Sequence, residues 1–412
     1  MSLPVIRQEG DSLVFEWDIG PARVQAEVEE VHHESSGWHA EIQWLNLSDE
    51  VRPLISAWKH INLSSPTTVK SHAKSLQEIT GFAASWDQMI EQIAARGIAD
   101  KKKGQEFVKL SGSTEPKPKR YLVDRILEEN QVSLFYGESG SCKSYLALAV
   151  GLSVQGGYPF LGLQPQHGNV LYLDYETDAE EFDRRIGKLC RGNDLEWEHL
   201  PEINYRRQVL ALADDLATIH RYIAAEKISL VIIDSLGGAC GGEPDKAETA
   251  LRFYGAVRQL SCTVLGVHHI TGAQMGERGK RRPFGSIYHV NIPRSLWELR
   301  SAGELESDVR NVAMYHRWSN NGRLWRPFGF EVVFDDRSVQ IKRSDMMTIP
   351  ELAAGTTQKE QILALLKAGA QFVPVIADRT GIPENQVRAV LSRYKRDFQK
   401  DGERWGLPYV EN

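Results

Sequence analysis

The sequence predicts an α/β protein in which a parallel-sheet core is flanked by two smaller domains. Between residues 121 and 345, short apolar runs at 132–136, 170–173, 230–233 and 263–267 alternate with longer helical stretches. Continuous β-branched runs separated by crossover helices are typical of a parallel sheet that is buried on both faces. Apolar side chains recur every second residue before this core, and paired helical patterns follow it.

The composition is that of an ordinary globular protein. The chain has 412 residues, 49 Lys and Arg against 55 Asp and Glu, a net charge of −6, and 42% hydrophobic residues. This length corresponds to about two to four domains, and the apolar fraction excludes a disordered tail protein and a collagen-like fibre. The mildly acidic total argues against a uniformly basic nucleic-acid binder, although it does not exclude local basic patches.

The cysteines and the hydropathy pattern predict a cytoplasmic protein. The four cysteines, at positions 142, 190, 240 and 262, form no CxxC pair, which favours reduced thiols over a disulfide framework or a zinc site. The N-terminus lacks the apolar stretch of a signal peptide, and no run approaches the ~20 apolar residues of a membrane span. We therefore expect no contact with a membrane.

Residues 1–98 predict a small α+β domain. Every second side chain is apolar over residues 23–29, with the same alternation at 13–17 and 40–44, so three or four antiparallel strands are expected within residues 1–48. Helical patterns follow near 68–79 and 86–96. Residues 99–120 are rich in Lys and contain two prolines, as in a solvated linker. Either simple spacing or contact with nucleic acid would account for its charge.

The C-terminal third of the sequence predicts further strands and a separate domain. Residues 311–316, 329–334 and 338–342 are expected to extend the core sheet, and 346–356 are expected to be a linker. In 357–412, Thr357 and Glu360 form a capping box, and Gly381 provides a turn before a second helix that is anchored by Val387 and Leu391. This spacing predicts a helix-turn-helix or winged-helix domain, which binds either nucleic acid or another protein.

The strongest chemical signal is a phosphate-binding loop directly after the strand at 132–136 and before a helix at 145–154. Its residues are Gly137, Glu138, Ser139, Gly140, Ser141, Cys142, Lys143 and Ser144. Glycines allow backbone N–H groups to surround phosphates, the Lys reaches the β- and γ-phosphates, and the hydroxyl binds Mg²⁺. Cys142 stands where the usual pattern has its second glycine, so we expect slower turnover or sensitivity to oxidation. The sequence therefore predicts ATP and Mg²⁺ as ligands.

Acidic side chains end two further strands. Asp234 follows the apolar run at 230–233, where a carboxylate holds Mg²⁺ through water. Asp174 and Glu176 follow the run at 170–173, at the sheet edge where open α/β sheets bind ligands. Glu176 is expected to polarise the attacking water, with Asp174 as the competing candidate.

A fourth strand ends in paired histidines, and a basic loop follows it. His268 and His269 are placed to sense the γ-phosphate and to relay its loss into residues 272–285. That loop carries Arg278, Lys280, Arg281 and Arg282, which suit a phosphate backbone. A second glycine-rich loop is expected at 237–242. Solvated loops without a partner remain the alternative for both segments.

In this order, the four strand-end motifs resemble those of RecA-fold ATPases, and among these they look most like the RepA-type hexameric replicative helicases and related ATPases of plasmids and phages. The resemblance covers about residues 121–345. It rests on GESGSCKS, Asp174-Tyr-Glu176, LVIIDS, the His268-His269 pair, and Gly285-Ser286 leading to Asn291-Ile-Pro-Arg294.

The resemblance implies a ring, expected to be a hexamer, in which ATP lies between subunits. Lys143 and Ser144 would bind phosphate and magnesium, Asp234 would be the magnesium acid, and Glu176 the catalytic carboxylate. One of the two histidines would be the γ-phosphate sensor. Arg294 would be the finger that reaches the neighbouring site, and Arg185 a further phosphate contact. The loops after Asp234 and after the histidines would contact single-stranded DNA in the pore.

Two functions follow as hypotheses. The first is an ATP-driven DNA motor, a replicative helicase or translocase of a mobile element, in which loss of the γ-phosphate shifts the loop at 272–285. The second is an ATP-switched DNA-binding initiator, loader or regulator, in which the C-terminal domain recognises duplex DNA. Its second helix carries Gln386, Arg388 and Arg393, side-chain types that recognise base edges in the major groove.

Overall fold

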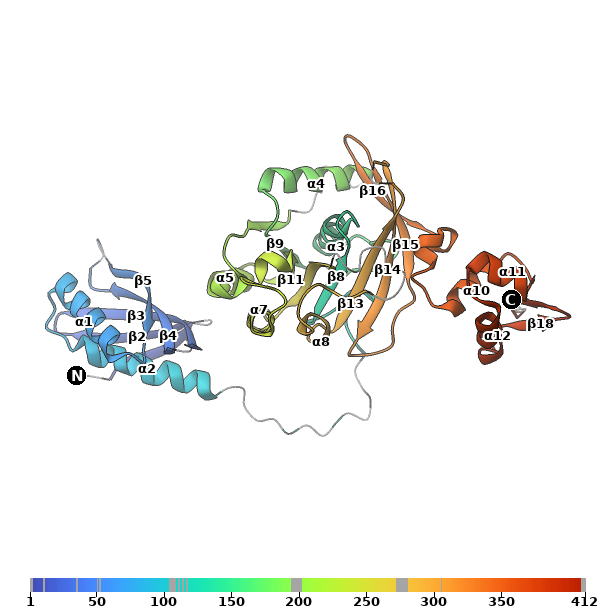
Figure 1. Cartoon of the computed structure of the whole chain (residues 1–412). Coiled ribbons are helices and arrows are strands. Elements are labelled where there is room, and N and C mark those ends of the chain that lie inside the picture. The colour runs from blue at the N-terminus through green and yellow to red at the C-terminus, as the bar shows by residue number, and fades with distance from the viewer. Residues whose placement is uncertain are drawn as a thin grey trace. The chain divides into compact units, whose positions relative to one another are not determined.

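The computed structural model describes residues 3–9, 12–34, 36–49, 51, 53–103, 109, 112, 115, 118–193, 202–271, 281–304 and 306–408. The chain consists of two compact units, residues 1–117 and 118–412 (Figure 1). Within the described residues, no helix is long and apolar enough to cross a membrane. The four cysteines, all of them described, are free thiols.

The N-terminal unit is a five-stranded antiparallel sheet followed by two helices. Its elements are β1 (Val5–Glu9), β2 (Ser12–Ile19), β3 (Ala22–Glu34), β4 (Gly37–Asn46), β5 (Leu54–Asn62), α1 (Pro66–Thr80) and α2 (Trp86–Lys103). The alternating side chains of β2–β4 fill a core in which Trp17 stacks on Trp44 and Trp44 meets Trp86 edge-on.

Two expectations for the N-terminal unit need correction. Strand β5 was not predicted, and its mixed pattern of exposed and buried side chains reflects its place at one end of the sheet, beside β4 alone. Helix α2 continues to Lys103, so residues 99–103 belong to this helix and not to a linker.

A nine-stranded sheet forms the core of the second unit. Its strands lie in the order β10-β9-β11-β12-β8-β13-β14-β15-β16. The strands from β10 to β13 run parallel, and β14, β15 and β16 continue antiparallel. The prediction of a parallel sheet that the last strands extend is therefore confirmed.

The elements of this core follow the expected alternation of strand and helix. The strands are β6 (Tyr121–Val123), β7 (Leu127–Glu128), β8 (Val132–Gly137), β9 (Asn169–Asp174), β10 (Asn204–Arg207), β11 (Ile228–Asp234), β12 (Thr263–His269), β13 (Ser295–Ala302), β14 (Val309–Ser319), β15 (Phe328–Phe334) and β16 (Val339–Ser344). The helices are α3 (Lys143–Gly156), α4 (Ala179–Gly192), α5 (Leu216–Ala225), α6 (Leu236–Ala239), α7 (Ala247–Gln259), α8 (Tyr288–Asn291) and α9 (Pro350–Ala353).

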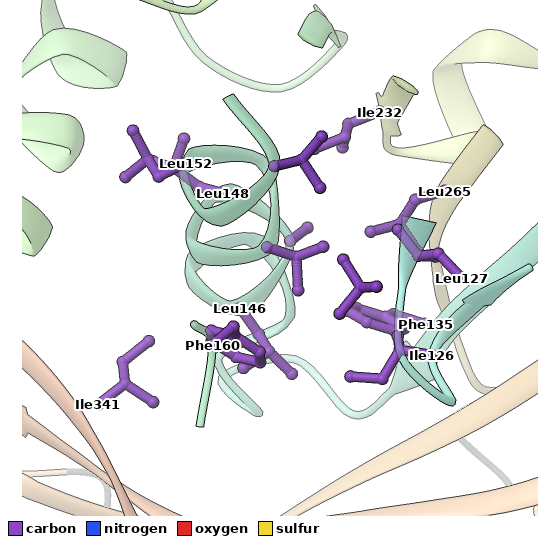
Figure 2. Close-up of a cluster of buried hydrophobic side chains, with 14 of the residues drawn as sticks. Ile126, Leu127, Phe135, Leu146, Leu148, Leu152, Phe160, Ile232, Leu265 and Ile341 are labelled. Carbon is purple, nitrogen blue, oxygen red and sulfur yellow. The ribbon is translucent and has the colours of Figure 1, made fainter. Parts of the chain in front are cut away.

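Helices cover both faces of the parallel strands, which explains their continuous apolar runs. Helix α3 lies on one face, where Figure 2 shows Phe135, Ile232 and Leu265 of the sheet beside it. Helices α5 and α7 bury their apolar side chains in a second cluster on the other face. A Cβ at Gly151 of α3 would lie 2.9 Å from Ile232 Cδ1, so a glycine here lets α3 approach the sheet closely.

The segment expected as a linker at 346–356 is part of the core instead. It contains a short 3₁₀ turn and helix α9 (Pro350–Ala353), and Met346 and Leu352 are buried with Ala313 and Tyr315 of β14. Tyr315 donates a hydrogen bond to the carbonyl of Leu352. Apolar side chains in this stretch anchor it beside β14.

The last part of the chain forms its own small core. Its elements are α10 (Gln358–Leu366), β17 (Gln371–Phe372), α11 (Val373–Thr380), α12 (Glu384–Arg393), β18 (Gln399–Asp401) and β19 (Arg404–Gly406), with the short strands in the order β17-β19-β18. The capping box of Thr357 and Glu360 is present. Gly381 ends α11 in the left-handed conformation at φ 68°, as its position in the turn requires.

Candidate nucleotide-binding site

The predicted phosphate loop connects β8 to α3 and is shaped by its backbone. A Cβ at Gly137 would lie 2.2 Å from the carbonyl oxygen of Leu299 on β13, so only glycine fits where the loop leaves the sheet. Gly140 has φ 77°. Cys142, at φ 60°, caps α3 in the left-handed conformation that favours glycine. The loop therefore keeps the backbone path of a glycine-rich loop, with strain at its one substituted position.

Lys143 lies at the start of α3 with its ammonium turned toward the loop. Its Nζ donates to the carbonyl oxygens of Glu138 at 2.6 Å and Gly137 at 3.2 Å. Burial lowers the pKa of Lys143 to about 8, and the nearby carboxylates of Asp234 and Glu176 oppose this shift. A buried ammonium next to a helix N-terminus is well placed to meet a phosphate anion.

Asp234 ends β11 and is almost completely buried. Tyr172 of β9 donates a 2.6 Å hydrogen bond to its Oδ2. Burial raises the pKa of Asp234, and hydrogen bonds from Tyr172 and Ser144 act in the opposite direction. Its Oδ1 is buried, and no described group donates a hydrogen bond to it.

This orphaned oxygen, on a carboxylate that also interacts with Ser144, fits a magnesium ion. Mg²⁺ bound with a nucleotide needs only one or two protein oxygens, because phosphates and water supply the rest. The described residues contain no cluster of three or more His, Cys, Asp or Glu side chains that would hold a metal by themselves. The donor set therefore suits a magnesium that arrives with phosphate, and such an ion would neutralise charge on the phosphate oxygens.

The structure separates the two acids that follow β9. Asp174 Oδ1 accepts hydrogen bonds from the backbone N–H groups of Glu176 and Thr177, at 2.8 and 3.0 Å, so this carboxylate holds the turn. Glu176 extends into the site and lies 3.5 Å from His269 Nε2. The hydrogen bond from His269 lowers the pKa of Glu176 to about 2, against the effect of burial. Glu176 is therefore ionised, as an acceptor for water must be.

The two histidines that end β12 have different surroundings. His269 is 40% exposed and faces Glu176. His268 is 1% exposed, its Nε2 lies 2.9 Å from the carbonyl oxygen of Phe284, and burial lowers its pKa to about 3. The sequence left either histidine as the γ-phosphate sensor. His268 is packed inside the fold, where burial disfavours its charged form, whereas His269 lines the cavity.

These groups surround one cavity of about 420 Å³ at the carboxyl edge of the parallel strands. Its walls come from the phosphate loop, β9, α4, β11 and β12. They are Ser139, Gly140, Cys142, Lys143, Ser144, Tyr145, Asp174, Glu176, Thr177, Arg185, Asp234, Val267 and His269. Arg185 reaches this cavity from α4, with its Nε 3.0 Å from Glu181 Oε1 and its guanidinium over the ring of Tyr145. The structure thus brings together residues that are up to 130 positions apart.

The basic residues expected to contact DNA are distributed unequally. Arg278 and Lys280 lie outside the described residues, and Arg282 is exposed. The prediction that Arg281 contacts DNA needs correction, because its side chain is only 8% exposed and forms ion pairs with Glu138 and Glu298. The segment expected as a loop at 237–242 begins within α6.

The remaining candidates lie away from the cavity. Arg294 is exposed, and its backbone N–H donates to the carbonyl of Val132 at the start of β8. It therefore lies at the edge of the sheet opposite Gly137. On α12, Val387 and Leu391 face the small core, which leaves Gln386, Arg388 and Arg393 exposed.

Two features of the site were not predicted from the sequence: the side chain of Tyr172 and the ion pair between Glu138 and Arg281. Tyr172 donates a hydrogen bond to Asp234, and its position two residues before Asp174 on the same strand would have placed the side chains of Tyr172 and Asp174 on one face. The ion pair between Glu138 and Arg281 joins residues too far apart in the sequence for spacing to reveal it.

Comparisons with known proteins agree with this geometry in part. A sequence-family model described as an AAA domain matches residues 103–275. A crystal structure of a KaiC-like protein from the hyperthermophilic archaeon Pyrococcus horikoshii OT3 aligns with 14% identity over 55% of this chain and 99% of that chain, with a TM-score of 0.38, too low to bear on the assignment. No curated protein matches. The family match and the geometry of the site together support a P-loop ATPase core.

Proposed function

We propose that the protein is an ATP-hydrolysing DNA motor that works as a ring, with nucleotide at the cavity beside Lys143. The observation that carries the proposal is the contact between His269 and Glu176. This contact joins Glu176, the acid proposed to orient water, to β12, the strand that comes directly before the basic residues of 272–285. Loss of the γ-phosphate at this point would change both the acid and the strand end.

Each residue of the cavity has a role in this proposal. Lys143 and the N–H groups of the phosphate loop bind the β- and γ-phosphates, and Arg185 adds a further positive charge. Ser144 and Asp234 hold the magnesium. Glu176 accepts a hydrogen bond from the attacking water and orients it toward the γ-phosphate, and positioning of this kind provides most of the catalysis in phosphoryl transfer.

The place of Arg294 supports a ring. Its backbone lies beside Val132, and β8 extends from there to Gly137 at ~3.3 Å per residue. This separation keeps Arg294 away from its own cavity, so a finger role requires a neighbouring subunit. We propose a homo-oligomer, most simply a hexamer, in which each cavity receives this arginine from the next protomer.

A second candidate function is an ATP-switched protein that binds duplex DNA without unwinding it. The three helices and the small sheet after residue 357 have the order of a winged helix, and α12 presents polar and basic side chains away from its core. In that case nucleotide would control assembly only, and the C-terminal domain would recognise a DNA sequence.

One experiment separates the two functions. A labelled DNA fork is incubated with the protein, magnesium and either ATP or a non-hydrolysable analogue, and the release of the displaced strand is followed. If the protein is a motor, the strand is released with ATP and not with the non-hydrolysable analogue. Tight binding of one duplex sequence with either nucleotide, and no release, would contradict the motor and favour the switch.

A further inference from the structure

The phosphate loop is joined to residues 281–285, called here the return segment. Arg281, which begins this segment, is held by the residues on both sides of Gly137. The Tyr136 hydroxyl donates a 3.0 Å hydrogen bond to the Arg281 carbonyl. Arg281 Nη1 lies 2.7 Å from Glu138 Oε1. Tyr136 thus fixes the backbone of Arg281, and Glu138 fixes its side chain.

The other side of Arg281 faces a fully buried carboxylate. Its Nε lies 3.9 Å from Glu298 Oε1, and the same carboxylate pairs with Arg300 at 2.6 Å and Arg317 at 2.5 Å. With two closer guanidinium partners, Glu298 is neutralised without Arg281. Charge-assisted pairs in buried surroundings are short and hold their partners firmly, so Glu298 provides a rigid support behind Arg281.

Glu138 connects this support to the groups that bind phosphate. Its carbonyl oxygen accepts hydrogen bonds from Lys143 Nζ at 2.6 Å and Ser141 Oγ at 2.7 Å. The orientation of the Glu138 side chain is fixed by Arg281, and the orientation of its peptide sets where the lysine and the serine rest. A displacement of Arg281 would therefore also displace Lys143, the lysine proposed to bind the γ-phosphate.

We propose that Arg281 is a positioning residue of the phosphate loop and that it links nucleotide affinity to the return segment, residues 281–285. The Glu138–Arg281 pair keeps the loop in the shape that receives phosphate, before any nucleotide arrives. Because coupling between two sites is reciprocal, a ligand that moves the segment changes nucleotide affinity, and nucleotide changes the affinity for that ligand. Only the identity of the ligand, DNA, rests on the proposed function.

The first test measures the equilibrium binding of a fluorescent ATP analogue to the full chain. Glu138→Gln removes the charge of the pair and retains the size of the side chain. We expect the Kd to rise about tenfold, as for loss of one charge-assisted hydrogen bond, and the KM for ATP to rise by a larger factor than kcat falls. The melting temperature should remain that of the matched control Glu331→Gln, which removes a comparably exposed carboxylate from its pair with Lys342.

A double-mutant cycle tests whether the two residues act through each other. If Arg281 acts through Glu138, then Arg281→Met raises the Kd by a similar factor, and Glu138→Gln adds little in that background. Additive effects, or an unchanged Kd in Glu138→Gln, would overturn the proposal. Should Arg281→Met fold poorly, Glu138→Gln alone decides, since Glu138 lies on the more exposed side of the pair.

The reciprocal test compares nucleotide Kd with and without single-stranded oligothymidine. The proposal expects a shift of severalfold in the wild type that disappears in Glu138→Gln while the variant still binds the DNA. A shift that persists in the variant would overturn the linkage. A wild type that does not bind DNA would contradict the proposed function, whereas the nucleotide measurements above would still decide the role of Arg281.

Discussion

At the scale of single residues, the phosphate loop carries strain at Cys142. This residue adopts the left-handed conformation, which costs a non-glycine residue about 1–2 kcal/mol. We expect Cys142→Gly to raise the free energy of unfolding by about 0.5–1 kcal/mol, because glycine relieves the strain and loses some chain entropy on folding. Urea denaturation checks this. Cys142→Ala is the control, since it removes the thiol and keeps the strain, and a gain equal to that of glycine would show that the backbone is not the cause.

The contact between His269 and Glu176 makes a prediction about pH. The hydrogen bond from His269 lowers the pKa of Glu176 to about 2 from an ordinary 4.5. In His269→Ala the pKa should rise toward that ordinary value, so activity should fall at a higher pH on acidification than in the wild type. The kcat of ATP hydrolysis between pH 4 and 7 measures this. His167→Ala, at an exposed position of the same core, should not change the pH at which kcat falls on acidification. If kcat falls at the same pH in both variants, His269 does not set the pKa of Glu176.

At the scale of elements, α12 is predicted to face DNA. Gln386, Arg388 and Arg393 are exposed while Val387 and Leu391 are buried. Replacing both arginines with Ala should weaken duplex binding about tenfold or more and reduce its salt dependence. Electrophoretic mobility shifts at several salt concentrations test this. Lys367→Ala, an exposed site at the end of α10, is the control, and equal losses in both variants would indicate a non-specific charge effect.

Sequence patterns identified the elements of the parallel core because these strands are buried on both faces and their apolar runs are continuous. The same reasoning missed β5, which lies at one end of its sheet with a mixed pattern. The cavity residues Lys143, Asp234 and Glu176 were predictable because strand ends meet at one edge. The roles of Arg281 and His268 were not, because burial decides them and their partners, Glu138 and Phe284, are brought close only by the fold.

At the scale of the whole molecule, the place of Arg294 makes a prediction about assembly. If the arginine acts on the neighbouring subunit, Arg294→Ala and Lys143→Ala proteins are each inactive, but a mixture regains activity at interfaces that combine an intact loop with an intact arginine. Random mixing gives roughly a quarter of the sites in this combination. ATP hydrolysis by the mixture measures the gain. If mixed oligomers form but ATPase activity is not regained, then Arg294 acts within its own subunit or has no role in catalysis.

The central claim is that Lys143 and Asp234 bind one MgATP and that it is hydrolysed there. The most direct measurement is steady-state ATP hydrolysis by the wild type, Lys143→Ala and Asp234→Asn, each with and without magnesium. We predict magnesium-dependent turnover in the wild type and a loss of at least about a hundredfold in either variant. Turnover that survives both substitutions, or that ignores magnesium, would contradict the account.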